Sequence, residues 1–437
     1  MKQLVLRFYA TVFAGAVGVV CFTTQVQAQD RADMQELLRI IEAQQKQLEA
    51  QQKQLDAQKK VLQEIQAQIA NSPEKPASTE AVAVAKKPAE EAPPEKVITS
   101  GGGERVKLSI SGHVNRMVSI IDDGDETDTY FVDNDASESQ IRFVGTAEAT
   151  DDLTLGTIIE LSIAPNKSGS VDQLNQEENN TFDQRRTEIT LDSKQWGLLS
   201  LGKGFTASYG TGAVDLSRTN VISYATLADL AGSVFFRESD SGDLTDLRIF
   251  QAFNSFDGLS RQNRLRYDSP NLAGFRVATS AISDNRYDAA LRWGGQSSGF
   301  KAAGAIAVAD PDEDNADLQY NGSFAVLHKD TGLNAAISLG LLERDDQDDQ
   351  QNYFFKLGWI KKFFPVGDTA FSVDYTRSLN LPTDDDDGYS VAAAAVQHFD
   401  KYGTELFGVY RVHSLDRDDE ADVDDIGVAA IGARVKF

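Results

Sequence analysis

From Val106 onward, apolar and polar residues alternate over stretches of roughly ten residues, and clusters of turn-forming residues separate these stretches. In one stretch, Leu333 and Ile337 fall on one face of a strand, while Asn334 and Ser338 fall on the other. After the first two dozen residues, no segment approaches the roughly 20 consecutive apolar residues that a membrane helix requires. Any membrane-spanning part must therefore consist of strands.

The alternation predicts sixteen strands. Their predicted starts lie near Val106, Ser139, Leu153, Phe182, Trp196, Ser260, Phe275, Arg286, Phe300, Leu318, Leu333, Asn352, Thr369, Gly388, Tyr402 and Ile426. A further strand-like run, Leu247 to Phe253, would make seventeen strands. Because bacterial single-chain barrels have even strand numbers, we assign this run to a long loop. A barrel of sixteen strands encloses an aqueous lumen rather than a core filled by side chains.

Long acidic connections alternate with short ones. The long connections include IDDGDETDTYFVDND, DPDEDNAD, ERDDQDDQ, PTDDDDG and LDRDDEADVDD, and the short ones include Ser297-Ser298, Asp330-Thr331-Gly332 and Asp400-Lys401. In outer-membrane barrels the long connections face the exterior and the short ones face the periplasm. A soluble sandwich or propeller would bury its apolar faces, whereas here small apolar residues lie beside purely acidic loops. We therefore predict an all-β, 16-stranded antiparallel transmembrane β-barrel over residues 106–437.

The N-terminus has the features of an export signal. Lys2 and Arg7 precede an apolar run from Phe8 to Phe22, and Val26-Gln27-Ala28 forms a small-residue cleavage signature. We predict a signal peptide over residues 1–28, with a short retained anchor helix as the alternative. Cleavage would remove Cys21, which is the single cysteine of the chain. The mature protein would then have no thiol chemistry and no cysteine-based metal site.

Residues 29–70 are predicted to form an α-helical coiled coil. Apolar residues recur every seven positions at Ile41, Leu48, Leu55, Leu62 and Ile69. The second core position is mostly Gln, so the apolar seam is thin and a lone helix would be marginal in water. A solvated single helix or a partly disordered spacer is the alternative. Residues 71–105 are rich in Pro, Ala, Glu and Lys and are predicted to form a semi-extended linker.

Charge and histidine placement exclude several other functions. The net charge of -25 argues against nucleic acid as a partner. The four histidines are scattered without metal-ligand spacing, so we predict neither a metal site nor a cofactor. The acidic loops could hold divalent cations that bridge to lipopolysaccharide phosphates. They lack the spaced ligand pattern of a calcium loop, so solvated loops are the favoured interpretation.

Three segments carry a family resemblance: LSISGHVNRMVSIIDDG, YFVDNDASESQIRFVGTAEATDDLTLGTIIE and FDQRRTEITLDSKQWGLLSLGKGFTASYGTGAVDLS. Residues 106–437 resemble the trimeric porins of Gram-negative bacteria, in particular alphaproteobacterial-type general porins. The final strand ends in the aromatic Phe437, as family members do. The predicted coiled coil departs from the plainest porins and is similar to the arrangement in coiled-coil-bearing trimeric porins. The resemblance implies a homotrimer and a water-filled channel. It also implies a third long loop, from about Thr206 to Leu259, that folds inward and opposes its acids to arginines on the wall.

Because successive side chains of a strand point to opposite faces, the positions of the apolar residues predict which side chains line this channel; we call this rule strand parity. Ile141 and Phe143 share the lipid face, so Arg142 points inward, and the same test places further arginines inside. These are Arg186, Arg264, Arg266, Arg276, Arg292 and Arg434. Arg185 would lie at the rim or at a subunit contact. An arginine that faced lipid near the bilayer centre would cost about 2–4 kcal/mol, which supports the inward placement. We predict that Arg142, Arg186, Arg264 and Arg266 line a pore constriction.

The opposing charges are predicted to come from the third long loop. Asp215 and Asp229 are the best candidates there, with Glu238 and Asp240 as weaker ones, and the alternative role for the first two is to cap turns. Opposed charges across a narrow pore orient dipolar solutes and penalise apolar ones.

The predicted function is passive outer-membrane diffusion of small hydrophilic solutes and ions by a homotrimer with a periplasmic N-terminal region. The predicted surroundings are outer-membrane lipid and lipopolysaccharide. The alternatives are a substrate-selective channel for small organic anions and an envelope tether that binds peptidoglycan through the N-terminal helix. An enzymatic role is not predicted, because no readable catalytic motif is present.

Overall fold

The computed structural model describes residues 96–98, 106–178, 182–311, 316–418 and 420–437. The chain divides into two compact units, residues 1–83 and 84–437, and every described residue belongs to the second unit. The predicted signal peptide and coiled coil lie outside the described residues, as does the predicted linker apart from residues 96–98. Within the described part of the chain, no helix is long and apolar enough to cross a bilayer.

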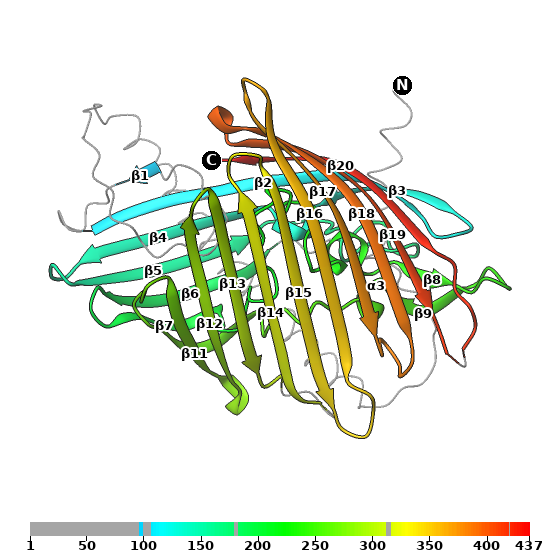
Figure 1. Cartoon of the computed structure of the whole chain (residues 1–437), viewed down its shortest axis with the longest axis horizontal. Coiled ribbons are helices and arrows are strands. Elements are labelled where there is room, and N and C mark those ends of the chain that lie inside the picture. The colour runs from blue at the N-terminus through cyan, green and yellow to red at the C-terminus, as the bar shows by residue number, and fades with distance from the viewer. Residues whose placement is uncertain (1–95, 99–105, 179–181, 312–315, 419) are drawn as a thin grey trace, which may run out of the picture. The chain divides into compact units, whose positions relative to one another are not determined.

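The second unit is an antiparallel β-barrel (Figure 1). Its strands are β2 (Val106–Asp122), β3 (Thr127–Asp133), β4 (Gln140–Glu148), β5 (Leu153–Ser162), β6 (Asp183–Ser193), β7 (Gly197–Phe205), β10 (Arg261–Asp268), β11 (Phe275–Ile282), β12 (Tyr287–Ser297), β13 (Phe300–Ala309), β14 (Ala316–His328), β15 (Leu333–Arg344), β16 (Gln350–Phe364), β17 (Gly367–Leu379), β18 (Asp387–Phe399), β19 (Thr404–Asp416) and β20 (Ile426–Lys436). β3 and β4 both pair with β2, the other consecutive strands of the barrel pair with each other, and β7 pairs with β10. The sheet closes because β20 pairs with both β19 and β2.

The barrel wall has sixteen strand positions, which we call staves, because β3 and β4 together occupy one of them. β3 pairs with the second half of β2, and β4 pairs with the first half. Residues 134–139 interrupt this stave and include the short helix η1 (Asp135–Ser137). The sixteen predicted strand starts lie within two residues of the observed ones. The sequence prediction missed β3, because its alternating residues lie in an acidic stretch that has the composition of a loop.

One short strand lies within the predicted linker. β1 (Lys96–Ile98) pairs antiparallel with the first half of β2, so that Lys96 lies opposite Ile110 and Ile98 opposite Leu108. Backbone hydrogen bonding to the barrel sheet therefore begins before residue 106, where we had predicted the barrel to start. The predicted linker thus contains at least these three residues of sheet.

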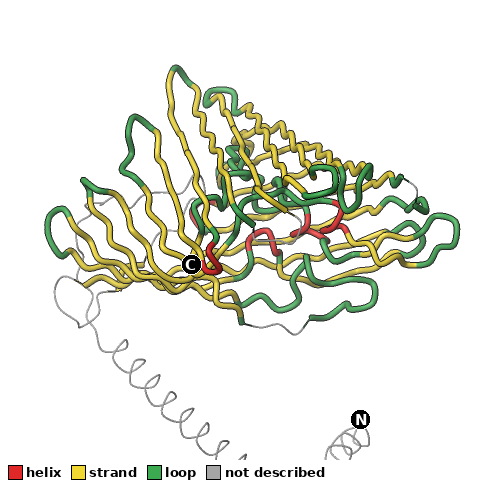
Figure 2. The backbone as a smooth tube through the Cα atoms, turned by 90° about the horizontal axis from the view of Figure 1, so that it is seen from below, coloured by secondary structure: helices red, strands yellow, loops and turns green. Residues whose placement is uncertain are grey.

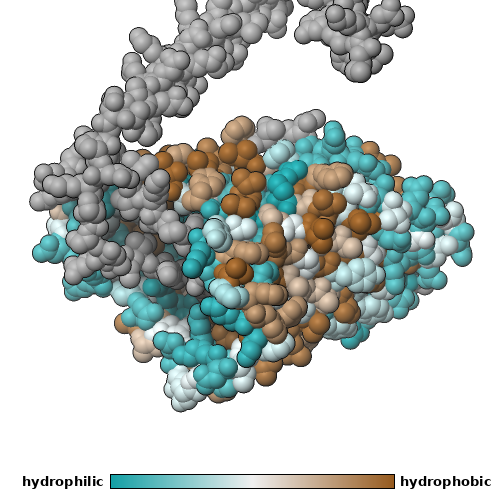
Figure 3. All heavy atoms as spheres, turned by 90° about the horizontal axis from the view of Figure 1, so that it is seen from above, coloured by the Kyte–Doolittle hydropathy of each residue, from teal (hydrophilic) through white to brown (hydrophobic). Residues whose placement is uncertain are grey.

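The two faces of the barrel strands differ in polarity. Outward-facing side chains are apolar and exposed, for example Val277 at 53% and Ile306 at 62% exposure. Their neighbours on the opposite face, such as Ser280 and Ser338, are buried and polar. Apolar side chains gather over the middle of one face of the molecule, and hydrophilic ones lie toward its edge (Figure 3). This is the distribution expected of a barrel that exposes its outer surface to lipid.

The long connection between β7 and β10, residues 206–260, is called the third loop. It contains α2 (Ala228–Ala231), β8 (Phe235–Arg237), β9 (Leu244–Arg248) and α3 (Ile249–Ala252). β8 and β9 pair with each other and not with the barrel sheet. The strand-like run Leu247 to Phe253 therefore belongs to this loop, as the even-number rule predicted. The short helices and loop segments lie among the surrounding strands in Figure 2.

An apolar core attaches the third loop to one side of the barrel. This core consists of buried side chains from the loop and from the barrel wall. The loop contributes Val221, Ile222, Leu230, Val234, Phe236, Ile249 and Phe253, and the wall contributes Met117, Val132, Phe354, Val396, Phe407 and Val428. Burial of this apolar surface favours one position of the loop against β16, β18, β19, β20, β2 and β3.

Candidate functional site

Two buried glutamates on the inner face of the barrel each bind two arginines. Glu160 on β5 accepts hydrogen bonds from Nε of Arg142 at 2.6 Å and Nε of Arg185 at 2.9 Å. Glu188 on β6 forms ion pairs with Arg186 and Arg264. Both glutamates are almost fully buried. Because two carboxylates serve four guanidinium groups, this part of the wall carries an excess of positive charge.

Arg185 also faces inward, so its predicted position at the rim or at a subunit contact is wrong. The register between β5 and β6 shifts here: Glu160 lies opposite Arg186, and Leu161 lies opposite Gln184. Arg185 is therefore the extra residue of a β-bulge, and a bulge redirects a side chain away from simple alternation. Its Nη1 atom lies 2.6 Å from Oε2 of Glu138.

Arg266 and Arg292 hold the beginning of the third loop. Arg266 pairs with Asp268 at 2.7 Å and donates a hydrogen bond to the carbonyl oxygen of Thr206 at 2.7 Å. Arg292 donates to the carbonyl oxygens of Ala207 and Tyr209, both at 2.7 Å. These bonds fix the first turn of the loop against β10 and β12.

Further along, the third loop binds the opposite side of the barrel through Asp215. Oδ2 of Asp215 lies 2.8 Å from Nζ of Lys356 on β16, and the lysine side chain is fully buried. Lys356 also donates to the carbonyl oxygen of Ser223 at 2.6 Å. Oδ1 of Asp215 accepts a hydrogen bond from the backbone N–H of Ser217 at 2.5 Å. The carboxylate thus both caps a turn and neutralises a wall lysine.

Asp229 lies in the first turn of α2, beside two acids that the sequence analysis did not select. These are Asp135 and Glu138, from the interruption between β3 and β4. Ser168 connects the two chain segments: its hydroxyl donates to the carbonyl oxygen of Asp229 at 2.5 Å and accepts from the backbone N–H of Asp135 at 3.1 Å. Both acids lie in the segment DNDASES, just before the second predicted strand, and this position is the feature of the sequence that could have identified them.

The three acids differ in their expected ionisation. Burial and the neighbouring Glu138 raise the pKa of Asp229 to about 7. Burial and the charge of Asp229 raise the pKa of Asp135 well above its usual range. Burial also opposes ionisation of Glu138, but Arg185 and Lys167 outweigh it and lower the pKa of Glu138 to about 2. Glu138 is therefore a permanent anion, whereas Asp229 titrates near neutral pH.

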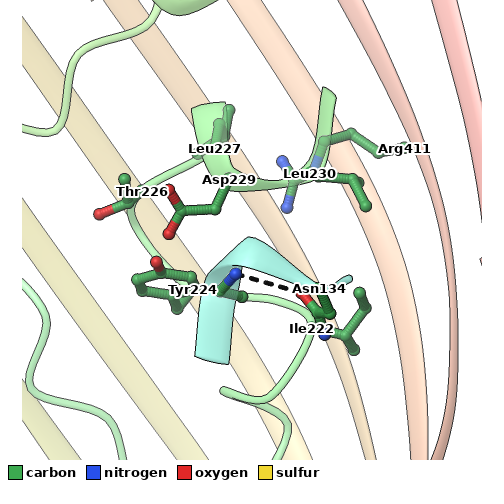
Figure 4. Close-up of a pocket in the computed structure, with 9 residues that line it drawn as sticks. Asn134, Ile222, Tyr224, Thr226, Leu227, Asp229, Leu230 and Arg411 are labelled. Carbon is green, nitrogen blue, oxygen red and sulfur yellow. Dashed lines mark hydrogen bonds between the residues drawn. The ribbon is translucent and has the colours of Figure 1, made fainter. Parts of the chain in front are cut away.

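Asp229 also lines a small cavity, together with Asn134, Tyr224 and Arg411 (Figure 4). Asn134 accepts a hydrogen bond from the backbone N–H of Ala136 and donates one to the carbonyl oxygen of Val221 at 2.8 Å. The interruption between β3 and β4 thus contacts the third loop directly.

Glu238 and Asp240 are not brought to the arginines. Both belong to the turn between β8 and β9, and Asp240 is exposed. Glu238 accepts a hydrogen bond from the hydroxyl of Ser241 at 2.5 Å, within the same turn. These two residues are therefore the weakest of the predicted opposing acids.

Arg261 is a further inner-face cation that strand parity missed. Its guanidinium lies 4.9 Å from the ring centre of Phe205 and 5.5 Å from that of Tyr209. By simple alternation with Leu265 and Tyr267 it would point outward. It is the first residue of β10, and the preceding Ser260 has a positive φ of 58°. The alternation rule therefore does not extend to this strand end.

Within the described residues, no group of three or more His, Cys, Asp or Glu side chains could hold a metal ion. The Nε2 atom of His113 lies 3.1 Å from the carbonyl oxygen of Ser137 in the interruption between β3 and β4. The groups that this site presents are charged side chains and hydrogen-bond donors.

Comparisons with known proteins give a family and a fold. A family model described as a Gram-negative porin matches residues 77–430. A search of the curated proteins gives no match. The barrel resembles OmpT, an outer membrane protein of Vibrio cholerae, at 11% identity with a TM-score of 0.52, over 78% of this chain and 100% of that chain. The trimer form of OmpT gives 10% identity and a TM-score of 0.50, over 76% and 100% of the two chains.

The anion-selective porin from Comamonas acidovorans is similar at 14% identity with a TM-score of 0.49, over 76% of this chain and 100% of that chain. At such identities the solved structures show a shared fold alone. The family model, by contrast, covers well over half of the chain, from within the predicted linker to the last strand. The resemblance inferred from the sequence is thus confirmed at the level of the family. The chain belongs to the Gram-negative porin family.

Proposed function

We propose that this porin, an outer-membrane channel for small solutes, is a passive general-diffusion pore that the third loop narrows. The main observation in support is that the loop forms hydrogen bonds and an ion pair with two separate parts of the barrel wall. Arg266 and Arg292 hold its beginning on β10 and β12, and Lys356 binds Asp215 on β16. A loop with these attachments leaves less of the lumen open to solutes, which supports a constriction at its level.

The proposed constriction has a basic side and an acidic side. Arg142, Arg186, Arg264 and Arg266 form the basic side, and Arg185 joins them. Asp229 is the proposed opposing acid, because its charge lies within electrostatic range of Arg261 and Arg185. Asp215 acts chiefly as the anchor for Lys356. Such a field orients dipolar solutes and penalises apolar ones, because an apolar solute must displace ordered water.

A homotrimer in the outer membrane is the proposed assembly. The barrel exposes an apolar outer surface, and Vibrio cholerae OmpT, which shares the fold, has been solved in a trimer form. The N-terminal region is proposed to project into the periplasm as a coiled coil. Deletion of residues 29–104 separates two roles for it. Trimers that dissociate would make it an oligomerisation device, whereas a loosened envelope with unchanged conductance would make it a tether to peptidoglycan.

A substrate-selective channel for small organic anions is the second candidate. It is favoured by the excess of arginines over glutamates around Glu160 and Glu188. The acidic outer loops act in the opposite direction, because they concentrate cations at the exterior mouth.

The reversal potential of purified trimers in a planar bilayer under a salt gradient tests the two candidates. A weak ion preference, together with permeation of uncharged sugars into liposomes, supports the general pore. Strong anion preference with exclusion of sugars supports the selective channel.

A further inference from the structure

The arginines of the inner wall differ in whether protein groups already occupy their donors. Arg142, Arg185, Arg186 and Arg264 bind glutamates, Arg266 binds Asp268, and Arg292 binds backbone carbonyls. Among the described residues, the guanidinium groups of Arg261 and Arg276 have no hydrogen bond and no ion pair, and the Nε atom of each is buried without a partner. Arg261 also lies over two aromatic rings. A half-buried guanidinium whose donors bind no protein group is available to bind an anion.

Aromatic rings fix the position of this guanidinium. Phe205 and Tyr209 stack with their ring centres 4.5 Å apart and their planes at 4°. Arg261 lies over both rings, and Arg186 lies 4.8 Å from the centre of the Phe205 ring. A guanidinium interacts with a ring through its flat face, while its five N–H donors lie in its plane. Stacking therefore restricts Arg261 and leaves its donors available.

The charges around Arg261 also favour an added anion. Arg185 is a neighbouring cation, and the nearby Glu138 and Glu160 are engaged by other cations. Asp229, which lies within electrostatic range of Arg261, has no ion pair among the described residues, and its raised pKa of about 7 leaves it only partly ionised near neutral pH. An anion beside Arg261 would thus meet two guanidinium groups and little opposing charge.

We propose that Arg261, with the stacked Phe205 and Tyr209, forms a binding subsite for the carboxylate of a small organic anion. The carboxylate matches the paired donors of a guanidinium, and the stacked rings offer apolar surface to the remainder of the solute. The inference rests on the proposed channel function and deepens it: the wall arginines that are paired with carboxylates supply a field, whereas Arg261 supplies a contact. It lies where β7 ends and the third loop begins, so solutes that pass the proposed constriction pass this subsite.

Benzoate is a suitable probe, because it joins a carboxylate to a flat apolar ring. In single channels of the full-length trimer bathed in chloride salt, added benzoate should reduce the current in a saturable manner. Arg261→Gln should weaken this block about tenfold or more, since it removes a charge-assisted contact. Arg142→Gln is the matched control: it removes the same charge from the same wall, and it should leave the apparent benzoate affinity within about twofold.

A second pair of variants tests the rings. Phe205→Leu and Tyr209→Leu should reduce the preference for benzoate over acetate. Equal weakening of the block by Arg261→Gln and Arg142→Gln would show that only the field acts, and would overturn the subsite. A wild-type channel that conducts chloride and sugars but is not blocked by benzoate would also overturn it, and would leave the general pore intact. A protein that forms no channel would overturn the proposed function itself.

Discussion

Lys356 on β16 and Asp215 in the third loop form an ion pair of 2.8 Å in which both side chains are buried. The two residues are far apart in the sequence, and the pair joins the loop to the wall opposite its point of entry. Removal of one partner leaves a buried charge without compensation, which typically costs about 3–5 kcal/mol. Removal of both partners avoids that penalty. The pair therefore specifies where the loop lies.

We predict that Lys356→Met destabilises the third loop more than the double variant Lys356→Met with Asp215→Asn does. The single variant should show a lower thermal midpoint and frequent current fluctuations in single-channel records. The double variant should recover most of the midpoint, because no unpaired charge remains buried. Equal behaviour of the two variants would mean that the pair does not fix the loop.

Neutralisation of the basic side should shift selectivity toward cations. Arg142→Gln and Arg186→Gln each remove one positive charge and leave Glu160 and Glu188, the carboxylates that these arginines bind, in place. The reversal potential in a salt gradient measures the shift, and the double variant should shift further than either single one. An unchanged potential would remove both residues from the constriction.

Arg185→Gln distinguishes the bulged β6 from a regular strand. A regular strand would place Arg185 on the outer face, and its loss would not alter the lumen. The bulge places it against Glu138 and Glu160, so we expect a shift toward cations as large as that of Arg186→Gln. Thr187→Gln, at an exposed neighbouring position, serves as the control and should leave the reversal potential unchanged.

The selectivity of the channel should depend on pH through Asp229. Its pKa is raised to about 7 by burial and by Glu138, so the carboxyl takes up a proton as pH falls through that value. The constriction then gains one unit of positive charge, and anion preference should rise between about pH 8 and about pH 6. Asp229→Asn should already show the low-pH behaviour at pH 8, with a flat profile. A wild-type profile without a step in this range would contradict the assignment.

The same residue links pH to stability. Because the pKa of Asp229 is higher in the folded protein than the ordinary value of 3.8, the folded state binds the extra proton between these two values. Stability from this group is therefore fully present below about pH 4 and is lost as pH rises through about 7. Relative to Asp229→Asn, the wild type should lose thermal stability over that range. The neighbouring Asp135 should add to the effect, since its pKa is raised too.

The barrel itself could be predicted from the sequence because lipid and lumen impose opposite polarities on alternate residues. Leu333 and Ile337 against Asn334 and Ser338 illustrate this rule, and it located every predicted stave. It failed where the chain departs from regular pleating. The bulge at Arg185 and the strand end at Arg261 redirect single side chains, and no local pattern in the sequence marks either position.

The third loop was located by family resemblance, but its contacts could not be predicted. Asp215 meets Lys356 only because the barrel closes and brings β16 opposite β7 and β10, and such a long-range contact has no signature in sequence spacing. The acids Asp135 and Glu138 were missed for a related reason. Their stretch was interpreted as an exterior loop, whereas β3 continues the stave and places them at its interruption.

The most direct test of the account is a single-channel record of the purified full-length protein in the presence of uncharged sugars of graded size. A trimer of narrowed pores should give discrete conductance steps that close in threes. Small sugars should enter and lower the conductance, and sugars above one sharp size limit should leave it unchanged. The absence of conductance steps, or a conductance that no sugar lowers, would contradict a water-filled channel narrowed by the third loop.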